Sequence, residues 1–575
     1  MNEQRNLLIA IVLSVLILFG FQWLFPKAPA PTPANQTPAA SSPAPDHSAP
    51  PAPEGRASAA APTPAEARSA ALESSRRIPL RTPRLQGSVA LQGARLDDLT
   101  LTEYRETTDP NSPAIVLLSP AGSANPYYAE FGWVPADGAV KVPGPDAVWT
   151  AAPGTSELTP GGRVVLTWDN GDGLRFVRTF TVDENYMFSV QQRVENYGGK
   201  PVTLHPYGLI ARTGTPPTAG MYILHEGPLG VLDGTLKEMK YADLKKEGTV
   251  REKSVGGWAG ITDKYWLTAL IPDQKAEVTG RFVHQNRDNT DHYQVDFTGT
   301  PVTVAPNAAV ETDFHMFAGA KQVNLLDAYG EKLGIDKFAY AIDFGWFWFL
   351  TKPFFYLLQM LHNALGNMGL AILALTVLIK AAMFPLANKS YVSMSKMKTI
   401  QPEMKKLQDR FGEDKVRLQQ EMMALYKREK VNPVSGCLPM VVQIPVFFAL
   451  YKVLFVTIEM RHAPFYGWIH DLSAPDPTTL FNLFGLIPWD AVHALPSFLH
   501  LGVWPLIMGV TMFLQQKLNP QPADPVQAKM MSFLPIVFTF LLANFAAGLV
   551  IYWAWSNTLS ILQQWVIMRK AGAKS

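Results

Sequence analysis

The chain has 575 residues, enough for several domains, and its charged fraction of 17% is below the roughly 25% usual for soluble domains. Its 50 Lys and Arg nearly balance its 48 Asp and Glu, so it lacks the basic excess of most nucleic-acid-binding proteins. A single cysteine, Cys437, excludes an internal disulfide framework and any metal site built from several cysteines.

An apolar run occupies residues 7–25. As a helix, these nineteen residues rise about 28 Å, close to the roughly 30 Å hydrocarbon core of a bilayer. The alternative is a cleaved signal peptide, because residues 28–30 have the small-residue form of a cleavage site. The run is longer than a usual signal-peptide core, and Pro31 follows the site directly. We therefore expect residues 1–25 to be retained as a transmembrane anchor.

Residues 26–79 form a linker rich in proline and alanine, with twelve prolines between Pro26 and Pro64. Such a segment buries too little apolar surface to fold and favours extended conformations. Residues 80–330 then change to short runs of β-branched and aromatic residues, as at 164–168 and 174–180, which flank the turn sequence Asp-Asn-Gly-Asp-Gly. No long helical period appears there, and we predict an all-β domain, most simply one large sandwich.

From residue 338 the chain resembles a membrane protein. The aromatic-rich segment 338–366 is predicted to be an amphipathic helix at the bilayer interface. Four apolar regions follow, at 367–387, 434–457, 501–517 and 530–568. The last is too long for one crossing, and a tight turn at 544–548 divides it into two helices. With the N-terminal anchor, the sequence predicts six spans.

Cationic residues in the loops indicate the orientation. Residues 388–432 hold eleven Lys and Arg against six Asp and Glu, whereas residues 458–500 hold one Arg and four acids. The first loop is therefore predicted to be cytoplasmic and the second external. A basic tail at 569–575 places the C-terminus inside. Six spans then place the N-terminus inside and the β domain outside.

The cytoplasmic loop is predicted to be a helical hairpin rather than disordered. Its first half has apolar residues spaced by three and four, and a second stripe follows Gly412. One interpretation is that the two stripes simply pack on each other. The other is that methionines of the hairpin also contact varied apolar partners, while its positive face touches lipid headgroups or ribosomal RNA. The candidate contact residues are Met397, Met404, Met422 and Met423.

Lys380 is the most unusual residue, because it is the only charge in the apolar stretch 370–386. A lysine at mid-bilayer costs about 2.5–3.5 kcal/mol on insertion scales. One explanation is snorkelling to the cytoplasmic surface, about 9 Å away along the helix. The other is a cation in a wet cavity open to the cytoplasm, with Thr376 one turn away on the same face. A second lysine, Lys452, lies nearer the outer end of its span, where snorkelling suffices.

No enzyme motif is present: the sequence lacks HExxH, GxSxG, the GxxxxGKS/T phosphate loop and GxGxxG. We predict no catalytic residue, no metal site and no cofactor, and therefore no enzyme. Other polar residues recur in the predicted spans, and together with Lys380 they are candidates to line a cavity. They include Gln443 and Tyr552, with the aromatic residues Phe447 and Trp553 close by in the sequence.

Several motifs in the C-terminal half closely resemble the YidC/Oxa/Alb family of membrane protein insertases. They are QQEMMALYK at 419–427, KVNP at 430–433, GCLP at 436–439, QIP at 443–445, APF at 463–465, WIHDLS at 468–473 and GLVIY at 548–552. The resemblance covers about 340–570. The N-terminal anchor and large external β domain are similar to the Gram-negative YidC form, in which that domain is a β-supersandwich.

The resemblance implies an insertase and chaperone of the inner membrane that works alone or with the Sec translocon. Five core helices would enclose a hydrophilic groove that is open to the cytoplasm and to lipid. Nascent membrane proteins are the implied partners, with the ribosome, the signal recognition particle receptor and anionic lipids as further candidates. Lys380 stands where the family usually has arginine. The remaining groove positions are Thr376, Gln443, Phe447, Met508, Tyr552 and Trp553.

Two other functions remain open on the sequence alone. A transporter with Lys380 as its substrate site would require paired repeats with discontinuous helices, and no internal repeat is visible. A membrane-tethered β domain that binds or isomerises sugars would require a catalytic acid and base within residues 80–320. The external segment 478–503 is longer than is usual in the family, and the sequence does not explain it.

Overall fold

The computed structural model describes residues 49–51, 64–136, 140–220, 224–412, 414–429, 431, 438–487, 500–519 and 525–570. All of them belong to one compact unit, His47–Ser575. The predicted anchor at 1–25 and Cys437 lie outside the described residues, as do most of the predicted linker and the end of the basic tail.

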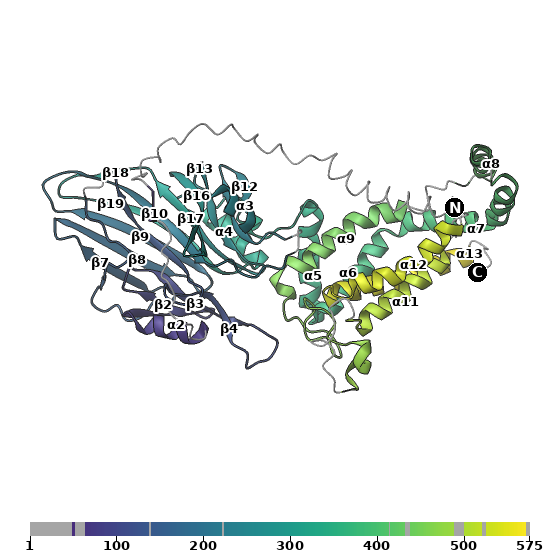
Figure 1. Cartoon of the computed structure of the whole chain (residues 1–575), viewed down its shortest axis with the longest axis horizontal. Helices are drawn as coiled ribbons and strands as arrows, with labels where there is room; N and C mark the ends of the chain where they lie inside the picture. Colours follow the sequence, from purple (N-terminus) through teal and green to yellow (C-terminus); the bar gives the residue numbers. More distant parts are fainter. Residues whose placement is uncertain are drawn as a thin grey trace. The chain divides into compact units, whose positions relative to one another are not determined.

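The β domain consists of two antiparallel sheets (Figure 1). The larger sheet contains β1 (Arg77–Arg81), β2 (Leu85–Ala90), β3 (Leu96–Arg105), β4 (Ala114–Leu118), β5 (Tyr127–Pro135), β10 (Val202–Thr213), β13 (Thr249–Val255), β16 (Glu277–Arg287), β17 (Thr290–Gly299) and β18 (Val302–Val304). The smaller contains β6 (Thr150–Ala151), β7 (Arg163–Asp169), β8 (Leu174–Val182), β9 (Met187–Asn196), β11 (Gly227–Leu232), β12 (Thr235–Glu238), β14 (Trp258–Thr262), β15 (Trp266–Pro272) and β19 (Ala308–Ala320). The predicted all-β sandwich is confirmed.

The β7–β8 hairpin shows how the turn sequence sets the register. The side-chain carbonyl of Asn170 accepts hydrogen bonds from the backbone amides of Asp172, at 2.7 Å, and Leu174, at 2.9 Å. Gly171 and Gly173 adopt φ of 82° and 87°, which glycine tolerates without a steric penalty. Because the side chain closes the turn, the strands pair in a fixed register and alternate residues of β8 become buried.

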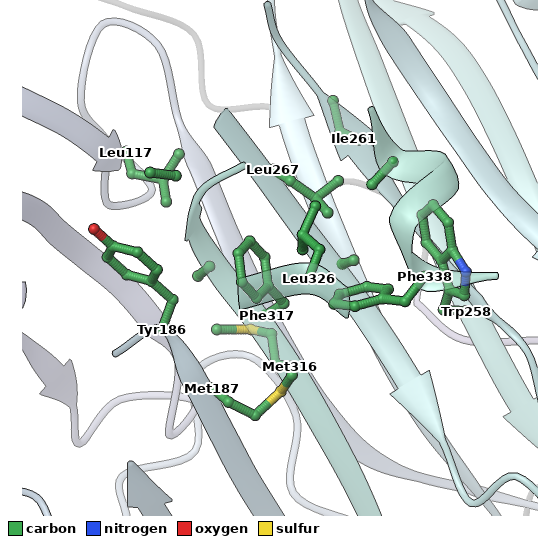
Figure 2. Packing of buried hydrophobic residues seen from close by; sticks show 14 of the residues in the cluster. Leu117, Tyr186, Met187, Trp258, Ile261, Leu267, Met316, Phe317, Leu326 and Phe338 are labelled. Atoms are coloured by element: carbon green, nitrogen blue, oxygen red, sulfur yellow. The ribbon is translucent and has the colours of Figure 1, made fainter. Parts of the chain in front are cut away.

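The core of the sandwich lies between the two sheets and is rich in aromatic residues. Phe131 on β5 and Phe314 on β19 meet across the gap, with ring centroids 5.9 Å apart. Figure 2 shows that Phe317 and Trp258 also contact Phe338, which lies in the 3-10 helix η1 (Phe338–Ala341), beyond the last strand and the helix that follows it. Burial of these large rings contributes to the hydrophobic stabilisation of the domain.

Three helices accompany the sheets, and a helical region follows them. The first group is α2 (Pro64–Glu73), α3 (Tyr241–Glu247) and α4 (Val323–Leu333). The helical region contains α5 (Trp348–Leu365), α6 (Met368–Ala382), α7 (Phe384–Phe411), α8 (Lys415–Arg428), α9 (Leu438–Val456), η3 (Ile458–Met460), η4 (Leu480–Gly485), α11 (Val503–Leu518), α12 (Pro525–Leu542) and α13 (Ala547–Lys570). Figure 1 shows α11, α12 and α13 alongside one another.

A sharp bend separates α6 from α7. The side-chain oxygen of Asn367 caps the start of α6 by accepting a hydrogen bond from the amide of Leu370 at 3.0 Å. Pro385 stands in the first turn of α7, where its missing amide hydrogen is tolerated but the hydrogen-bond series of α6 cannot continue. The chain therefore bends by 67° at Met383, and α7 runs unbroken past residue 387, where the sequence suggested the end of a span.

None of the described helices is, taken singly, both long and apolar enough to cross a bilayer; the bent pair α6 and α7 meets that measure jointly. The segments Val441–Val456 and Ala528–Leu542 are shorter apolar helices. The apolar region 530–568 is divided between α12 and α13, as the turn sequence predicts, although α12 begins five residues earlier, at Pro525.

The start of α13 is held by the loop that follows α9. The amide of Ala547 donates to the carbonyl of Ala474 at 2.7 Å, and the amide of Gly548 donates to the carbonyl of Leu472 at 2.9 Å. These bonds satisfy amides that have no partner within the helix. A side chain at Gly548 would approach the Leu472 carbonyl oxygen to 3.2 Å, so the glycine permits the close contact.

Candidate functional site

Lys380 lies in the last turn of α6 and reaches two neighbouring helices. Its ammonium donates a hydrogen bond to Ser560 Oγ on α13 at 2.9 Å and a longer one to Gln443 Oε1 on α9 at 3.4 Å. The side chain is only partly exposed. The lysine therefore joins three helices that lie far apart in the sequence.

Gln443 extends this network to a second residue of α13. Its amide nitrogen donates to the hydroxyl of Tyr552 at 3.0 Å, while Ser560 Oγ donates to the carbonyl of Ser556 at 2.9 Å. We call Lys380, Gln443, Tyr552 and Ser560 the polar cluster. Because Ser560 and Gln443 use neutral oxygens to hold the ammonium, they orient it without cancelling its charge.

Lys380 and Lys452 have different partners. Lys452 on α9 forms an ion pair with Asp343, with Nζ 2.6 Å from Oδ2. Among the residues that the structure describes, no carboxylate forms an ion pair with Lys380. A charge in apolar surroundings without a counter-charge is unfavourable and commonly marks a functional position. The charge of Lys380 is therefore available to an acidic ligand, whereas the charge of Lys452 is already paired with Asp343.

Thr376 lies on α6 one turn before Lys380 but is turned toward its own helix. Its hydroxyl donates to the carbonyl of Ile372 at 2.7 Å, and the residue is 1% exposed. Among the described residues, the hydroxyl of Thr376 therefore bonds to its own helix and not to the polar cluster, as in many threonines of apolar helices.

An aromatic cluster, which consists of Phe447 on α9 and Trp553 on α13, lies next to the polar cluster. The two rings stack with centroids 5.1 Å apart and planes 17° apart. Met508 on α11 is fully buried against Val550 of α13, and Trp553 packs against the same group. Tyr552 and Trp553 are consecutive, so α13 presents the polar and aromatic clusters on adjoining faces.

The hairpin residues lie in a separate place, on α7 and α8. Ile400, Met404, Leu425 and Val431 form a buried cluster, against which Met397 and Met422 pack partly buried. The two predicted stripes thus pack on each other. Met423 is 50% exposed. Of the four predicted hairpin contacts, Met423 is the one whose side chain is substantially free to meet another molecule.

Ser560 is the member of the polar cluster that sequence reasoning missed. A signal was present, because Tyr552, Ser556 and Ser560 repeat every four residues and so share one face of α13. Single serines in apolar helices are common, however, and the pairing with Lys380 depends on how α6 meets α13. Within the described ranges, no group of three or more His, Cys, Asp or Glu is placed to bind a metal ion.

Two family models together match nearly the whole chain after its first 76 residues. The first, described as YidC periplasmic domain, matches residues 77–357, and the second, described as 60Kd inner membrane protein, matches residues 360–574. The chain is 53% identical to a membrane protein insertase YidC of Methylobacterium nodulans, covering 100% of this chain and 96% of the relative. It is 51% identical to that of Granulibacter bethesdensis, covering 99% and 98%.

Solved structures give more distant likenesses. A crystal structure of an active YidC insertase matches 85% of this chain and 92% of its own, at 16% identity and a TM-score of 0.34. A galactose mutarotase-like protein from Lactobacillus casei matches 42% of this chain at 11% identity and a TM-score of 0.29. Both scores are too low to support any conclusion.

The periplasmic-domain model covers the two-sheet β domain and the inner-membrane-protein model covers the helical region with the polar cluster, so the chain is of the class of α-helical membrane proteins with a large periplasmic domain. The family matches and the full-length relatives then identify the group: the chain belongs to the YidC family of the inner membrane. The predicted resemblance and fold class are confirmed. The relatives are named as insertases and not as enzymes.

Replacement of Lys380 by methionine tests whether the lysine is kept for stability. Lys380→Met removes a charge without a counter-ion from apolar surroundings, so we expect the free energy of unfolding to stay the same or rise by up to about 3 kcal/mol. In contrast, Lys452→Met leaves Asp343 without its partner and should destabilise the protein by about 1–3 kcal/mol. Thermal unfolding of the full chain in detergent compares the two variants. Strong destabilisation by Lys380→Met would show that the lysine is structural.

Proposed function

We propose that this chain is a membrane protein insertase and chaperone that inserts and folds proteins of the inner membrane. The observation that carries the proposal is the polar cluster, in which three apolar helices hold an ammonium and every acceptor among the described residues is neutral. The insertase names of relatives that match the chain over its full length support the same assignment. Nascent membrane proteins are then its substrates.

The mechanism follows from the cost of moving polar groups through hydrocarbon. A substrate hairpin carries a polar external segment, and each unsatisfied polar group in lipid costs several kcal/mol. A hydrophilic groove, open to the cytoplasm and to lipid, shortens the dry distance that the segment has to cross. The Lys380 ammonium at this groove attracts acidic residues of the segment. The attraction is brief, because the acids leave when the segment reaches water on the external side.

The aromatic cluster receives the other part of the substrate. In the proposal, the apolar helix of the substrate slides past Phe447, Trp553 and Met508, with Thr376 nearby, and then moves into lipid. Transfer of an apolar helix from water to hydrocarbon is favourable by about 25 cal/mol per Å² of apolar surface. This free energy drives the step, so the chain itself uses no nucleotide.

The proposed topology has six spans, both termini in the cytoplasm and the β domain in the periplasm. The basic helices α7 and α8 then lie on the cytoplasmic side, where positively charged loops are typical. Their charge suits anionic lipids or ribosomal RNA, and Met423 offers an exposed apolar contact. The Sec translocon, the ribosome and the signal recognition particle receptor are the proposed partners.

Charge reversal at Lys380 tests the electrostatic step. We expect Lys380→Glu to reduce insertion of substrates with acidic external segments at least tenfold, while Lys380→Arg keeps most activity because it keeps the charge. Insertion into proteoliposomes, scored by protection of the substrate from protease, measures both. Lys389→Glu is the matched control, since Lys389 is an exposed lysine on α7. Equal loss for substrates with neutral external segments would contradict an electrostatic role.

A second variant neutralises the cation while Lys380 stays in place. Ser560→Asp puts a carboxylate beside the ammonium, to which Ser560 Oγ is now bonded at 2.9 Å. The resulting ion pair should lower insertion of the acidic substrates several-fold, as loss of the lysine would. Thr558→Asp adds the same charge two residues away, at a hydroxyl bonded to its own helix, and should have the smaller effect. The idea fails if the two variants behave alike in the same protease-protection assay.

A further inference from the structure

The external loop between α9 and α11 carries an exposed apolar tip. It lies within the segment that the sequence left unexplained, and Asn482 is the only polar residue among 480–487. Leu486 is 83% exposed. The apolar tip consists of six large apolar side chains, each between 39% and 83% exposed: Leu480, Phe481, Leu483, Phe484, Leu486 and Ile487.

The base of the tip is firmly attached to the start of α11. The carboxylate of Asp476 accepts hydrogen bonds from the indole of Trp468, at 3.1 Å, and from the amide of Trp504, at 2.9 Å. The amide of Leu480 donates to the carbonyl of Leu501 at 2.8 Å. Since Trp504 lies in the first turn of α11, the tip has a fixed position at the external end of that helix.

The tip also holds strained backbone. Leu483 and Phe484 both adopt left-handed conformations, with φ of 48° and 58°. Two consecutive non-glycine residues in this region are unfavourable and persist only where another requirement outweighs the strain. Backbone hydrogen bonds close this turn, from the amide of Phe484 to the carbonyl of Thr479 at 2.9 Å and from the amide of Ile487 to the carbonyl of Asn482 at 3.0 Å. The resulting conformation leaves the Leu483 and Phe484 side chains exposed.

The chemistry of the tip favours lipid over a protein partner. A specific protein interface surrounds its apolar centre with polar and charged groups, and residues 480–487 contain no charge. In the described part of the loop, the acid that lies nearest in the sequence is Asp476, and it is occupied by the bonds at the base. Tyr466 and Trp468, exposed by 62% and 40%, lie in the same loop and are residue types that concentrate at the bilayer interface.

We propose that the apolar tip inserts into the outer leaflet of the bilayer, where lipid acyl chains cover its six side chains. The insertion fixes the depth of the external end of α11 and thereby the level at which the external side of the helical region meets lipid. This inference rests on the external position of the loop in the proposed topology. It does not depend on any role of Lys380.

Photolabelling from lipid tests the inference on the unmodified full chain. The protein is reconstituted in phosphatidylethanolamine and phosphatidylglycerol vesicles that contain a phospholipid with a diazirine in its acyl chain, and adducts are mapped by mass spectrometry. We expect adducts on residues 480–487, as on the exposed apolar residue Phe448 of α9, and none on Asn289 in an exposed turn of the β domain. Labelling of Phe448 without labelling of 480–487 would overturn the proposal.

Substitutions and a spin label separate lipid from protein as the occupant. Phe484→Asp should reduce adducts in the tip at least fivefold, while the control Asn482→Asp leaves them nearly unchanged. With the single native cysteine replaced, a label at Leu486→Cys should be more accessible to oxygen than to a water-soluble nickel chelate, in nanodiscs that hold one copy. The reverse order would show that water covers the tip. Low accessibility to both reagents would show that protein covers it, and either result would overturn the proposal.

Discussion

An ammonium group whose partners among the described residues are all neutral oxygens is the constraint on which the proposed function depends. Lys380 on α6 meets Ser560 on α13 and Gln443 on α9, and Gln443 in turn donates a hydrogen bond to Tyr552. These bonds set the position of the ammonium between the three helices, although the fold itself should tolerate a methionine in place of the lysine. The same partners leave the charge uncancelled, which makes the cluster suited to attract an acidic segment briefly.

Helix α13 connects the electrostatic and apolar halves of the site. Tyr552 belongs to the polar cluster, and its neighbour Trp553 stacks on Phe447. Consecutive residues of a helix point about 100° apart, so one helix can serve both clusters at once. The start of α13 is in turn fixed by the carbonyls of Leu472 and Ala474 in the external loop. That loop therefore helps to position the polar and aromatic clusters on α13, and it also carries the apolar tip.

Much of this organisation is predictable from sequence, because turns and amphipathic helices depend on residues that are close together in the chain. The turn around Asn170 predicts the β7–β8 hairpin, and the spacing of apolar residues predicts that α7 and α8 pack together. The bend at Met383 was missed because hydropathy alone does not mark it. Ser560 was missed because its partner lies 180 residues away, and only the packing of α6 against α13 brings them together.

A substrate in transit is expected to touch the polar and aromatic clusters together. Photo-crosslinking of ribosome-stalled nascent membrane proteins to probes placed at residues 380, 447 and 553 measures this directly. We expect strong crosslinks at all three positions and few at Leu378, which is 46% exposed and lies on the opposite face of α6 from Lys380. Crosslinks that are equally strong at Leu378, or that are absent from residue 380, would show that the substrate does not pass the polar cluster.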